Sequence, residues 1–456
     1  MAPTDPVRII GADWLIPMDP PGRIIRRGGV RIDPAGVIVA VGPIDEIAQA
    51  APAGESVEFF ESATITPGLI NSHAHLDMTG WRGRLTGRAG LPLHDWVVPI
   101  AIERAIRSVA KVAADARSGA AESLAAGVTT VVDVTPAWTG WGEVRAAVSQ
   151  TAIRQIGLAE VLGFGERGEQ VWAKAEKLLG VSSDECRVAS EDGSRLAVPR
   201  ESEIAHAQCP IPNALAIGLS PHAPYSTSGE IYRRCIAAAR AGRLPLMTHL
   251  AETAEEIEFC RTGSGPWRRR LEQFAGPMDD AALQTPGCSP VEYMRRLGLL
   301  DHAPTLLAHV NYLCAGDLEL LASGHAAVVY CPRSADYFGH RDHPWQRMRQ
   351  AGIIVAIGTD SLASAPDLSI LAELRFLHER FPEVPAEQLF AMATRDAAGA
   401  IGQAGRVGTL IPGGWADLSI WRTSQSGSSA DAALADVLES SVQPQPIGVR
   451  VGGREP

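Results

Sequence analysis

The stretch TPGLINSHAHLDMTG, residues 66–80, marks the point at which the pattern of the sequence changes. Its apolar start is followed by two histidines one residue apart, His73 and His75. In a β-strand alternate side chains share a face, so both imidazoles project from the end of a strand into the same space. Chance gives about 0.3 such pairs in a chain with this histidine content. The pair makes half a metal site, and the rest of the sequence must supply the other half.

From residue 66 onward, apolar runs alternate with alanine-rich or amphipathic segments. The eight apolar runs are GLINSHAH (68–75), GVTTVVDVT (127–135), IRQIGLAEVLG (153–163), LAIGLSPHAP (215–224), LPLMTHLAE (244–252), TLLAHVNYL (305–313), HAAVVYCPRS (325–334) and IIVAIGTDS (353–361). Segments with helical composition and period lie between them, at 101–126, 229–242, 315–323 and 367–380. Eight strand–helix units predict an α/β fold, a (β/α)8 TIM barrel, because parallel strands need helical crossovers. An open doubly wound sheet is the alternative.

The sequences of both chain ends predict short strands separated by turn residues. Residues 6–65 have the pattern of antiparallel β-structure, and GRVGTLIPGGWADLSIW and GVRVGG return to it after residue 405. We therefore expect a small β-sandwich domain built from both ends, at 1–65 and 406–456. The barrel occupies 66–405 between them.

Two stretches, 165–205 and 253–304, are longer than ordinary connecting loops. Each is predicted to carry helices of its own. The first contains the polar sequence SEDGSRLA (190–197), which predicts a mobile segment.

Composition limits the class of partner. The net charge is −11 and the pI near 5.6, which argues against a nucleic-acid polymer or an anionic membrane, since binding phosphate needs a basic surface. The N-terminus lacks a basic segment followed by a long apolar one, and no run approaches about 18 apolar residues. The seven cysteines are scattered, which suits reduced buried thiols. We expect a soluble cytoplasmic protein with a small-molecule substrate, and a homodimer as the candidate assembly.

Catalytic groups in a barrel of this kind come from the C-terminal ends of several strands, where the loops converge. Five of the 12 histidines and two carboxylates fall at such ends: His73, His75, His222, His249, Glu252, His309 and Asp360. All are predicted to face one cavity. Three imidazoles and a carboxylate make a nitrogen–oxygen site suited to Zn²⁺, or to Fe²⁺, with room for a water. We assign the ligands as His73, His75, His249 and Asp360.

The centre is predicted to hold one divalent metal ion. A two-metal site usually needs a bridging group, often a carbamylated lysine at the fourth strand. The three lysines, Lys111, Lys174 and Lys177, all precede that strand. The other seven histidines have no partner in this scheme and are predicted to be structural, with His340 as the strongest exception.

The predicted metal lowers the pKa of its bound water towards about 7 and so produces hydroxide near neutral pH. Glu252 lies three residues past His249, where a strand becomes a helix, and is the predicted general acid. Asp360 takes the water proton and passes it to a leaving amine. His309 polarises or positions the oxygen of the tetrahedral intermediate.

Three further residues each have two interpretations. Trp96, after the first strand, either lines the substrate pocket or packs in the core. Glu160 ends the third strand and either accepts a hydrogen bond from a sugar hydroxyl or forms an internal salt bridge. Arg333 ends the seventh strand and either holds an anionic substrate group or neutralises a carboxylate.

Six sequence motifs indicate the family of the protein. They are PGLINSHAH, SPHAPYS, THLAETAEE, LLAHV, GTDSLAS and, near the end of the chain, GxLxPGxxADL. Together they resemble the metal-dependent amidohydrolase superfamily over nearly the whole chain. The branch that includes cytosine deaminase, S-adenosylhomocysteine/methylthioadenosine deaminase and aminodeoxyfutalosine deaminase is the most similar. VVYCPRSADYFGH and GTDSLASAPDLSILAELR most resemble aminodeoxyfutalosine deaminases, in which an adenine-type ring is converted to hypoxanthine. Ala335 stands where that motif often carries a histidine.

The resemblance implies roles for individual residues. In that branch the equivalents of the four ligands assigned above bind metal, and those of Glu252 and His309 act in catalysis. The positions of His222, in SPHAPYS, and Ser364, in TDSLAS, resemble substrate-contacting positions.

The leading hypothesis is hydrolytic deamination of an aminated N-heterocycle, the adenine ring of a nucleoside-like metabolite, with release of ammonia. A second hypothesis keeps the machinery and changes the leaving group, as in triazine chlorohydrolases or hydrolases of cyclic amidines and amides. A third, from another class, is a barrel scaffold without turnover.

Overall fold

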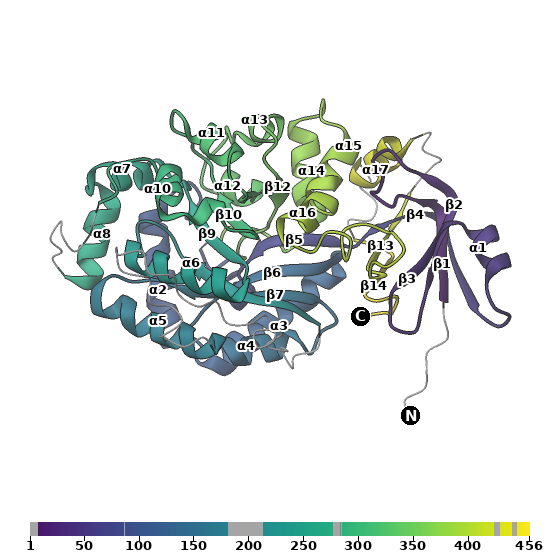
Figure 1. Cartoon of the computed structure of the whole chain (residues 1–456), viewed down its shortest axis with the longest axis horizontal. Helices are drawn as coiled ribbons and strands as arrows, with labels where there is room; N and C mark the ends of the chain where they lie inside the picture. Colours follow the sequence, from purple (N-terminus) through teal and green to yellow (C-terminus); the bar gives the residue numbers. More distant parts are fainter. Residues whose placement is uncertain are drawn as a thin grey trace, which may run out of the picture.

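The computed structural model describes residues 8–85, 87–180, 213–276, 283, 285–423, 429–439 and 445–456. Figure 1 shows a large part, in which helices surround a sheet, beside a smaller part made mainly of strands. The early and the late strands of the chain lie together in the smaller part (Figure 1).

The eight predicted barrel strands are all present. They are β5 (Leu69–Ala74), β6 (Val128–Pro136), β7 (Arg154–Val161), β8 (Ala214–Pro221), β9 (Leu246–Leu250), β10 (Thr305–His309), β11 (Ala327–Tyr330) and β12 (Val355–Ile357). They are hydrogen-bonded in sequence order, and every pair is parallel. Every residue of β6 is buried, as expected for a strand covered on both faces. The TIM barrel prediction is confirmed.

The ring closes just beyond the end of β12. Ala74 and Asp360 form a parallel bridge, and the N–H groups of Thr359 and Asp360 donate to the carbonyl of His73 at 3.1 and 3.0 Å. A Cβ atom at Gly358 would lie 2.8 Å from the Cβ of His73, so this crossing needs a glycine. The first and the last barrel strands therefore meet at residues predicted to bind metal.

Helices cover the outside of the barrel (Figure 1). They are α2 (Leu93–Ile106), α3 (Val109–Ala125), α4 (Trp141–Val148), α5 (Gly165–Leu179), α6 (Gly229–Gly242), α7 (Ala254–Thr262), α8 (Pro266–Ala275), α10 (Pro290–Leu297), α11 (Asp317–Ala322), α12 (Pro332–Tyr337), α13 (Trp345–Gln350), α14 (Ile370–Arg380), α15 (Ala386–Met392), α16 (Arg395–Ala400) and α17 (Ala430–Glu439), with the 3₁₀ helices η1 (Leu76–Trp81) and η2 (Leu299–Asp301). Serine N-caps begin α6 and α14, where Ser228 and Ser369 accept backbone N–H bonds.

Both long stretches carry helices, as predicted. The stretch 253–304 contains α7, α8, α10 and η2, and the stretch 165–205 begins with α5. The predicted mobile sequence at 190–197 lies outside the described residues.

The two chain ends form one six-stranded sheet in the order β14-β13-β4-β1-β2-β3. Its strands are β1 (Arg8–Leu15), β2 (Ile25–Ile32), β3 (Ile38–Pro43), β4 (Ser56–Pro67), β13 (Leu418–Arg422) and β14 (Gly448–Arg450). The expectation of purely antiparallel pairing was wrong for β1 and β4, which pair in parallel. Helix α1 (Ile44–Ala50) lies between β3 and β4 and packs Ile44 and Ile47 on the sheet, so the chain crosses over and returns in the direction of β1.

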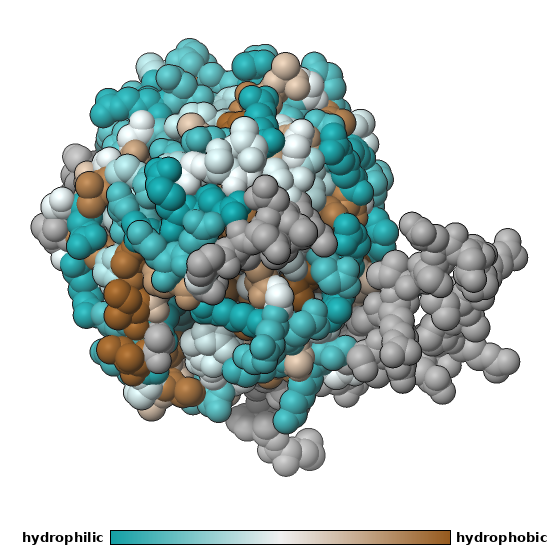
Figure 2. Space-filling view, turned by 90° about the vertical axis from the view of Figure 1, so that its left-hand side faces the viewer, coloured by the Kyte–Doolittle hydropathy of each residue, from teal (hydrophilic) through white to brown (hydrophobic). Residues whose placement is uncertain are grey.

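Composition bears on three features of the structure: membrane-spanning helices, disulfides and surface hydropathy. Among the described residues, no helix is long and apolar enough to cross a membrane. None of the described cysteines forms a disulfide; they are Cys235, Cys260, Cys288, Cys314 and Cys331. Figure 2 shows a mostly hydrophilic face with hydrophobic residues gathered along one side.

Candidate metal centre and active site

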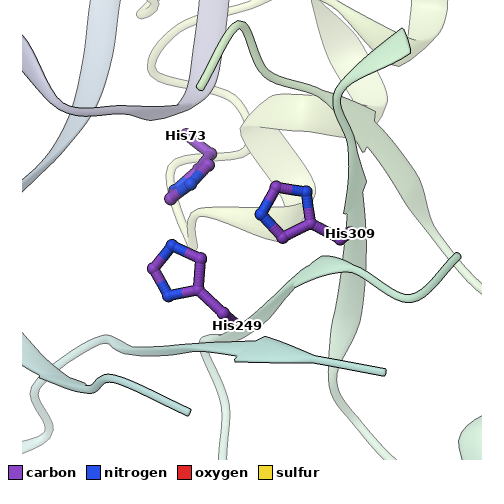
Figure 3. A group of neighbouring side chains, drawn as sticks. All are labelled: His73, His249 and His309. Atoms are coloured by element: carbon purple, nitrogen blue, oxygen red, sulfur yellow. The ribbon is translucent and has the colours of Figure 1, made fainter. Parts of the chain in front are cut away.

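The ends of β5, β9, β10 and β12 bring four histidines and one aspartate together. In Figure 3 the rings of His73, His249 and His309 point toward one another. The Nε2 atoms of His75 and His249 lie 3.4 Å apart, and Oδ1 of Asp360 lies 3.8 Å from Nε2 of both His73 and His75. All five side chains belong to buried residues.

Hydrogen bonds at the far side of two rings fix where their lone pairs point. Nδ1 of His75 donates to the carbonyl of Val134 at 3.0 Å, and Nδ1 of His249 donates to the carbonyl of His222 at 3.1 Å. Burial, reinforced by the neighbouring imidazoles, holds the pKa of both rings well below the usual value, so both are neutral. Their Nε2 atoms therefore face each other with lone pairs only.

Such an arrangement suits a cation between the rings. Nε2 of His73 is buried and has no hydrogen-bond partner among the described residues, and its imidazole also has a pKa lowered by burial. Three unprotonated imidazole nitrogens and a carboxylate oxygen converge here, which is the donor set that a single divalent metal ion prefers. The residues present therefore fit the predicted metal.

Two overlapping groups of side chains have ligand atoms within 4.8 Å of one another: His73, His249 and His309, and His73, His75 and Asp360. The ligand set predicted from sequence draws on both groups. His309, predicted to act on substrate, also lies within reach of the centre. Its φ is +72°, a left-handed backbone that turns the chain sharply at the end of β10.

The two oxygens of Asp360 have different surroundings. Oδ1 faces the imidazoles, while Oδ2 accepts hydrogen bonds from the hydroxyls of Ser334 at 2.8 Å and Ser364 at 3.1 Å. Burial raises the pKa of Asp360, and these two hydrogen bonds oppose the rise. Ser364, whose position resembles a substrate contact, thus lies on the carboxylate. Ser334 is a contact that sequence reasoning missed, although it ends the quoted run HAAVVYCPRS.

Glu252 lies beside the cluster. Its Oε1 is 3.6 Å from Nε2 of His309, and the residue is buried. Burial raises the pKa of Glu252 well above its usual value, and the nearby carboxylates of Asp360 and Glu256 add to the rise. The raised pKa favours the protonated form, from which the carboxyl group can donate a proton.

His222 lies beside His249, and Glu160 lies beside His222. The ring of His222 is centred 4.8 Å from that of His249, and its Nδ1 is 2.6 Å from the hydroxyl oxygen of Ser226. Glu160 accepts a hydrogen bond from Arg104 at 3.3 Å, so the internal salt bridge is formed. Oε1 of Glu160 is buried and has no hydrogen-bond partner in the described part of the chain. The other interpretation, a hydrogen bond from a substrate hydroxyl to Glu160, therefore stays a prediction.

Trp96 and Arg333 both make internal contacts. The indole N–H of Trp96 donates to the hydroxyl of Tyr337 at 3.2 Å, in a buried aromatic cluster. The guanidinium of Arg333 donates to Glu373 and Asp367, each at 2.7 Å. For Arg333 the geometry favours the interpretation that it neutralises carboxylates.

Two further contacts were not predicted. Arg104 donates to Asp77 as well as to Glu160, and so places a half-buried cation beside His222. Nε2 of the buried His343 donates to the carbonyl of His309 at 2.7 Å, while His340, the expected exception, contacts Tyr312. Both histidines come from the same short segment, FGHRDHP, so sequence alone did not separate their roles.

A model described as the amidohydrolase family matches residues 64–455. The chain belongs to the amidohydrolase family. Among curated relatives, aminodeoxyfutalosine deaminase of Deinococcus radiodurans is 30% identical over 389 residues, covering 82% of this chain and 83% of that protein. The 5-methylthioadenosine/S-adenosylhomocysteine deaminase of Halobacterium salinarum is 30% identical over 414 residues, with 89% and 82% coverage.

The fold of this amidohydrolase is also that of solved structures. An adenosine deaminase from Xanthomonas campestris with bound zinc superposes with a TM-score of 0.77 and 24% identity, covering 99% of this chain and 93% of that one. The barrel and the sheet built from the chain ends are therefore shared with a structure of nearly the same extent.

Proposed function

We propose that this amidohydrolase is a metal-dependent hydrolytic deaminase of an aminated N-heterocycle, and that its substrate is the adenine ring of a nucleoside-like metabolite. The observation that carries the proposal is the position of Glu252, a buried acid whose Oε1 lies 3.6 Å from Nε2 of His309 in the imidazole cluster and whose pKa burial raises well above its usual value. Deamination needs a proton on the ring nitrogen before the ring carbon can accept a nucleophile. The names of the two curated relatives support the choice of substrate class.

We propose one Zn²⁺ as the metal, held by His73, His75, His249 and Asp360. The nitrogen–oxygen donor set supports this choice, as do the lone pairs that face each other across 3.4 Å. A bound divalent ion supplies a Lewis acid that lowers the pKa of water towards about 7. The other steps belong to the side chains around it.

Glu252 donates its proton to the ring nitrogen next to the amino-bearing carbon. Asp360 accepts the proton that water releases as the water oxygen bonds to that carbon, and passes it to the amine. The carbon–nitrogen bond then breaks, ammonia leaves, and the hydroxyl proton of the adduct returns to Glu252. His309, 3.6 Å from Glu252, stabilises the oxygen of the tetrahedral adduct. His222 and Oε1 of Glu160 contact the substrate beyond the ring; the lack of a hydrogen-bond partner for this oxygen among the described residues supports its role.

The test is ammonia release from a panel that contains adenosine, methylthioadenosine, S-adenosylhomocysteine and aminodeoxyfutalosine, with zinc content measured on the same sample. Ammonia and a hypoxanthine product from at least one compound are expected. Chloride release from a triazine, or ring opening without ammonia, would replace the deaminase proposal with the second hypothesis. A protein that holds no stoichiometric metal and gains no activity with added zinc or iron would favour the scaffold.

A further inference from the structure

A two-residue turn connects the metal-binding strand to the proposed acid. His249 lies in β9, Glu252 precedes α7, and Ala251 between them has φ of +48°. This left-handed backbone is disfavoured for any residue with a Cβ atom. A turn of this kind persists only where its surroundings hold it.

The carboxylate of Glu256 holds the turn from the first turn of α7. Its Oε1 accepts the N–H of Ala251 at 2.8 Å, and its Oε2 accepts the N–H of Glu252 at 3.0 Å. The residue is fully buried, at 0% exposure. Thr253, the N-cap of α7, accepts the N–H of Glu256 at 3.2 Å and so fixes the helix end that carries the carboxylate.

The segment after β10 holds the other polar atoms of the same turn. The N–H of Tyr312 donates to the carbonyl of Ala251 at 3.2 Å, and the side-chain amide of Asn311 donates to the carbonyl of Glu252 at 3.0 Å. All four backbone polar atoms of these two residues are thus engaged. One side chain, Glu256, supplies both acceptors.

We propose that Glu256 is a positioning residue for the proposed acid Glu252: it clamps the strained turn at Ala251 so that the Glu252 side chain is presented to the cluster. The inference rests on the proposed function only for the consequence in catalysis. Both oxygens of Glu256 accept backbone N–H groups, so its action is exerted through the turn. A misplacement of about 1 Å at a reacting group costs roughly 100-fold in rate.

The first test is Glu256→Gln, which keeps the size of the side chain. The amide offers one acceptor and one NH₂ group, so one of the two backbone N–H groups loses its partner. Glu258→Gln, an exposed position on the same helix, is the matched control. Zinc content and thermal midpoint of each variant establish that the fold is intact.

Hydrogen–deuterium exchange of the free protein tests, without any substrate, whether Glu256 holds the two backbone N–H groups of the turn. The amides of Ala251 and Glu252 are expected to be strongly protected in the wild type, and to exchange at least about 10-fold faster in Glu256→Gln. The control should leave both unchanged. Rapid exchange in the wild type, or unchanged exchange in Glu256→Gln, overturns the inference. This readout holds even if no panel compound is deaminated, so the two proposals fail separately.

The kinetic test uses the panel compound that is turned over. Glu256→Gln is expected to lower kcat by about 10- to 100-fold and to change KM by less than about 3-fold, because the acid is displaced while the substrate still binds. An unchanged kcat despite faster exchange would show that the clamp does not position the acid.

A double-mutant cycle with Ala251→Gly separates a clamp from a general structural role. Glycine adopts a positive φ without strain, so the turn needs less support. The kcat ratio of Glu256→Gln to its parent should therefore move closer to 1 in the Ala251→Gly background. Equal ratios in the two backgrounds would contradict the clamp, and the same background supplies a folded variant if Glu256→Gln alone does not fold.

Discussion

Replacing Ser334 with alanine tests how Asp360 is held. The substitution removes the 2.8 Å hydrogen bond from the Ser334 hydroxyl to Oδ2 of Asp360 and leaves the 3.1 Å bond from Ser364. A hydrogen bond to a charged group contributes about 1.5–3 kcal/mol. If that free energy is lost in the transition state, kcat falls by about 10- to 150-fold. The Ser364 hydroxyl still donates to the same oxygen, which places the expected result toward the lower end.

The same substitution should weaken metal binding. Removing a partner of a metal ligand typically costs about 10- to 100-fold in metal affinity. We therefore expect both changes in Ser334→Ala: a lower affinity in competition with a zinc chelator, and a lower kcat at saturating zinc.

Ser220→Ala is the matched control. Ser220 is a buried serine at the end of β8 whose hydroxyl has no hydrogen-bond partner among the described residues. The chemical change is identical, but no hydrogen bond is lost. The reasoning about Asp360 is refuted if Ser334→Ala matches this control within about 3-fold in both zinc affinity and kcat.

Three other results are expected. Glu252→Gln removes the proton donor at constant size and should lower kcat by about 10²- to 10⁴-fold, with zinc content unchanged; normal turnover would exclude Glu252 as the acid. Chelation should abolish ammonia release, and zinc restored at about 1,000 times its Kd should raise the free energy of unfolding by about 4 kcal/mol, measured by thermal or urea denaturation. Burial raises the pKa of Asp133 to about 7, so the unfolded chain loses this proton first and the stability of the wild type falls as pH rises from about 4 to 7. Asp133→Asn should flatten that fall in urea titrations, and parallel curves for the two proteins would contradict it.

The fold was predictable because burial on both faces leaves a simple trace in a sequence. Each of the eight barrel strands lies in an apolar run, and histidines or acids at the ends of β5, β8, β9, β10 and β12 come together once the sheet closes. The parallel pairing of β1 with β4 was not predictable, since α1 is only seven residues long and gives too little periodicity to signal a crossover.

The details of the site depend on side-chain directions, which the alternation of a strand does not fix. Ser334 lies in the six-residue helix α12 and His343 in the loop after it, and neither segment is long enough for a period of 2 or 3.6 to predict a side-chain direction. The competing interpretations of Trp96 and Arg333 likewise depended on which neighbours α12, α14 and the segment before α14 would supply. The domain boundaries at 65/66 and 405/406, the cytoplasmic location and the homodimer stay predictions.

The closure of the barrel at Ala74 and Asp360 has a consequence for how the protein is made. Strand β5 emerges early from the ribosome, yet its neighbour on the closing side is translated almost 300 residues later, since Asn71 and Thr359, which are hydrogen-bonded, are 288 positions apart. A nascent chain that ends before residue 360 contains histidines of the centre but lacks Asp360. Any truncated product that ends before residue 360 should therefore lack both a closed ring and a working centre, so partial translation yields no partially active enzyme.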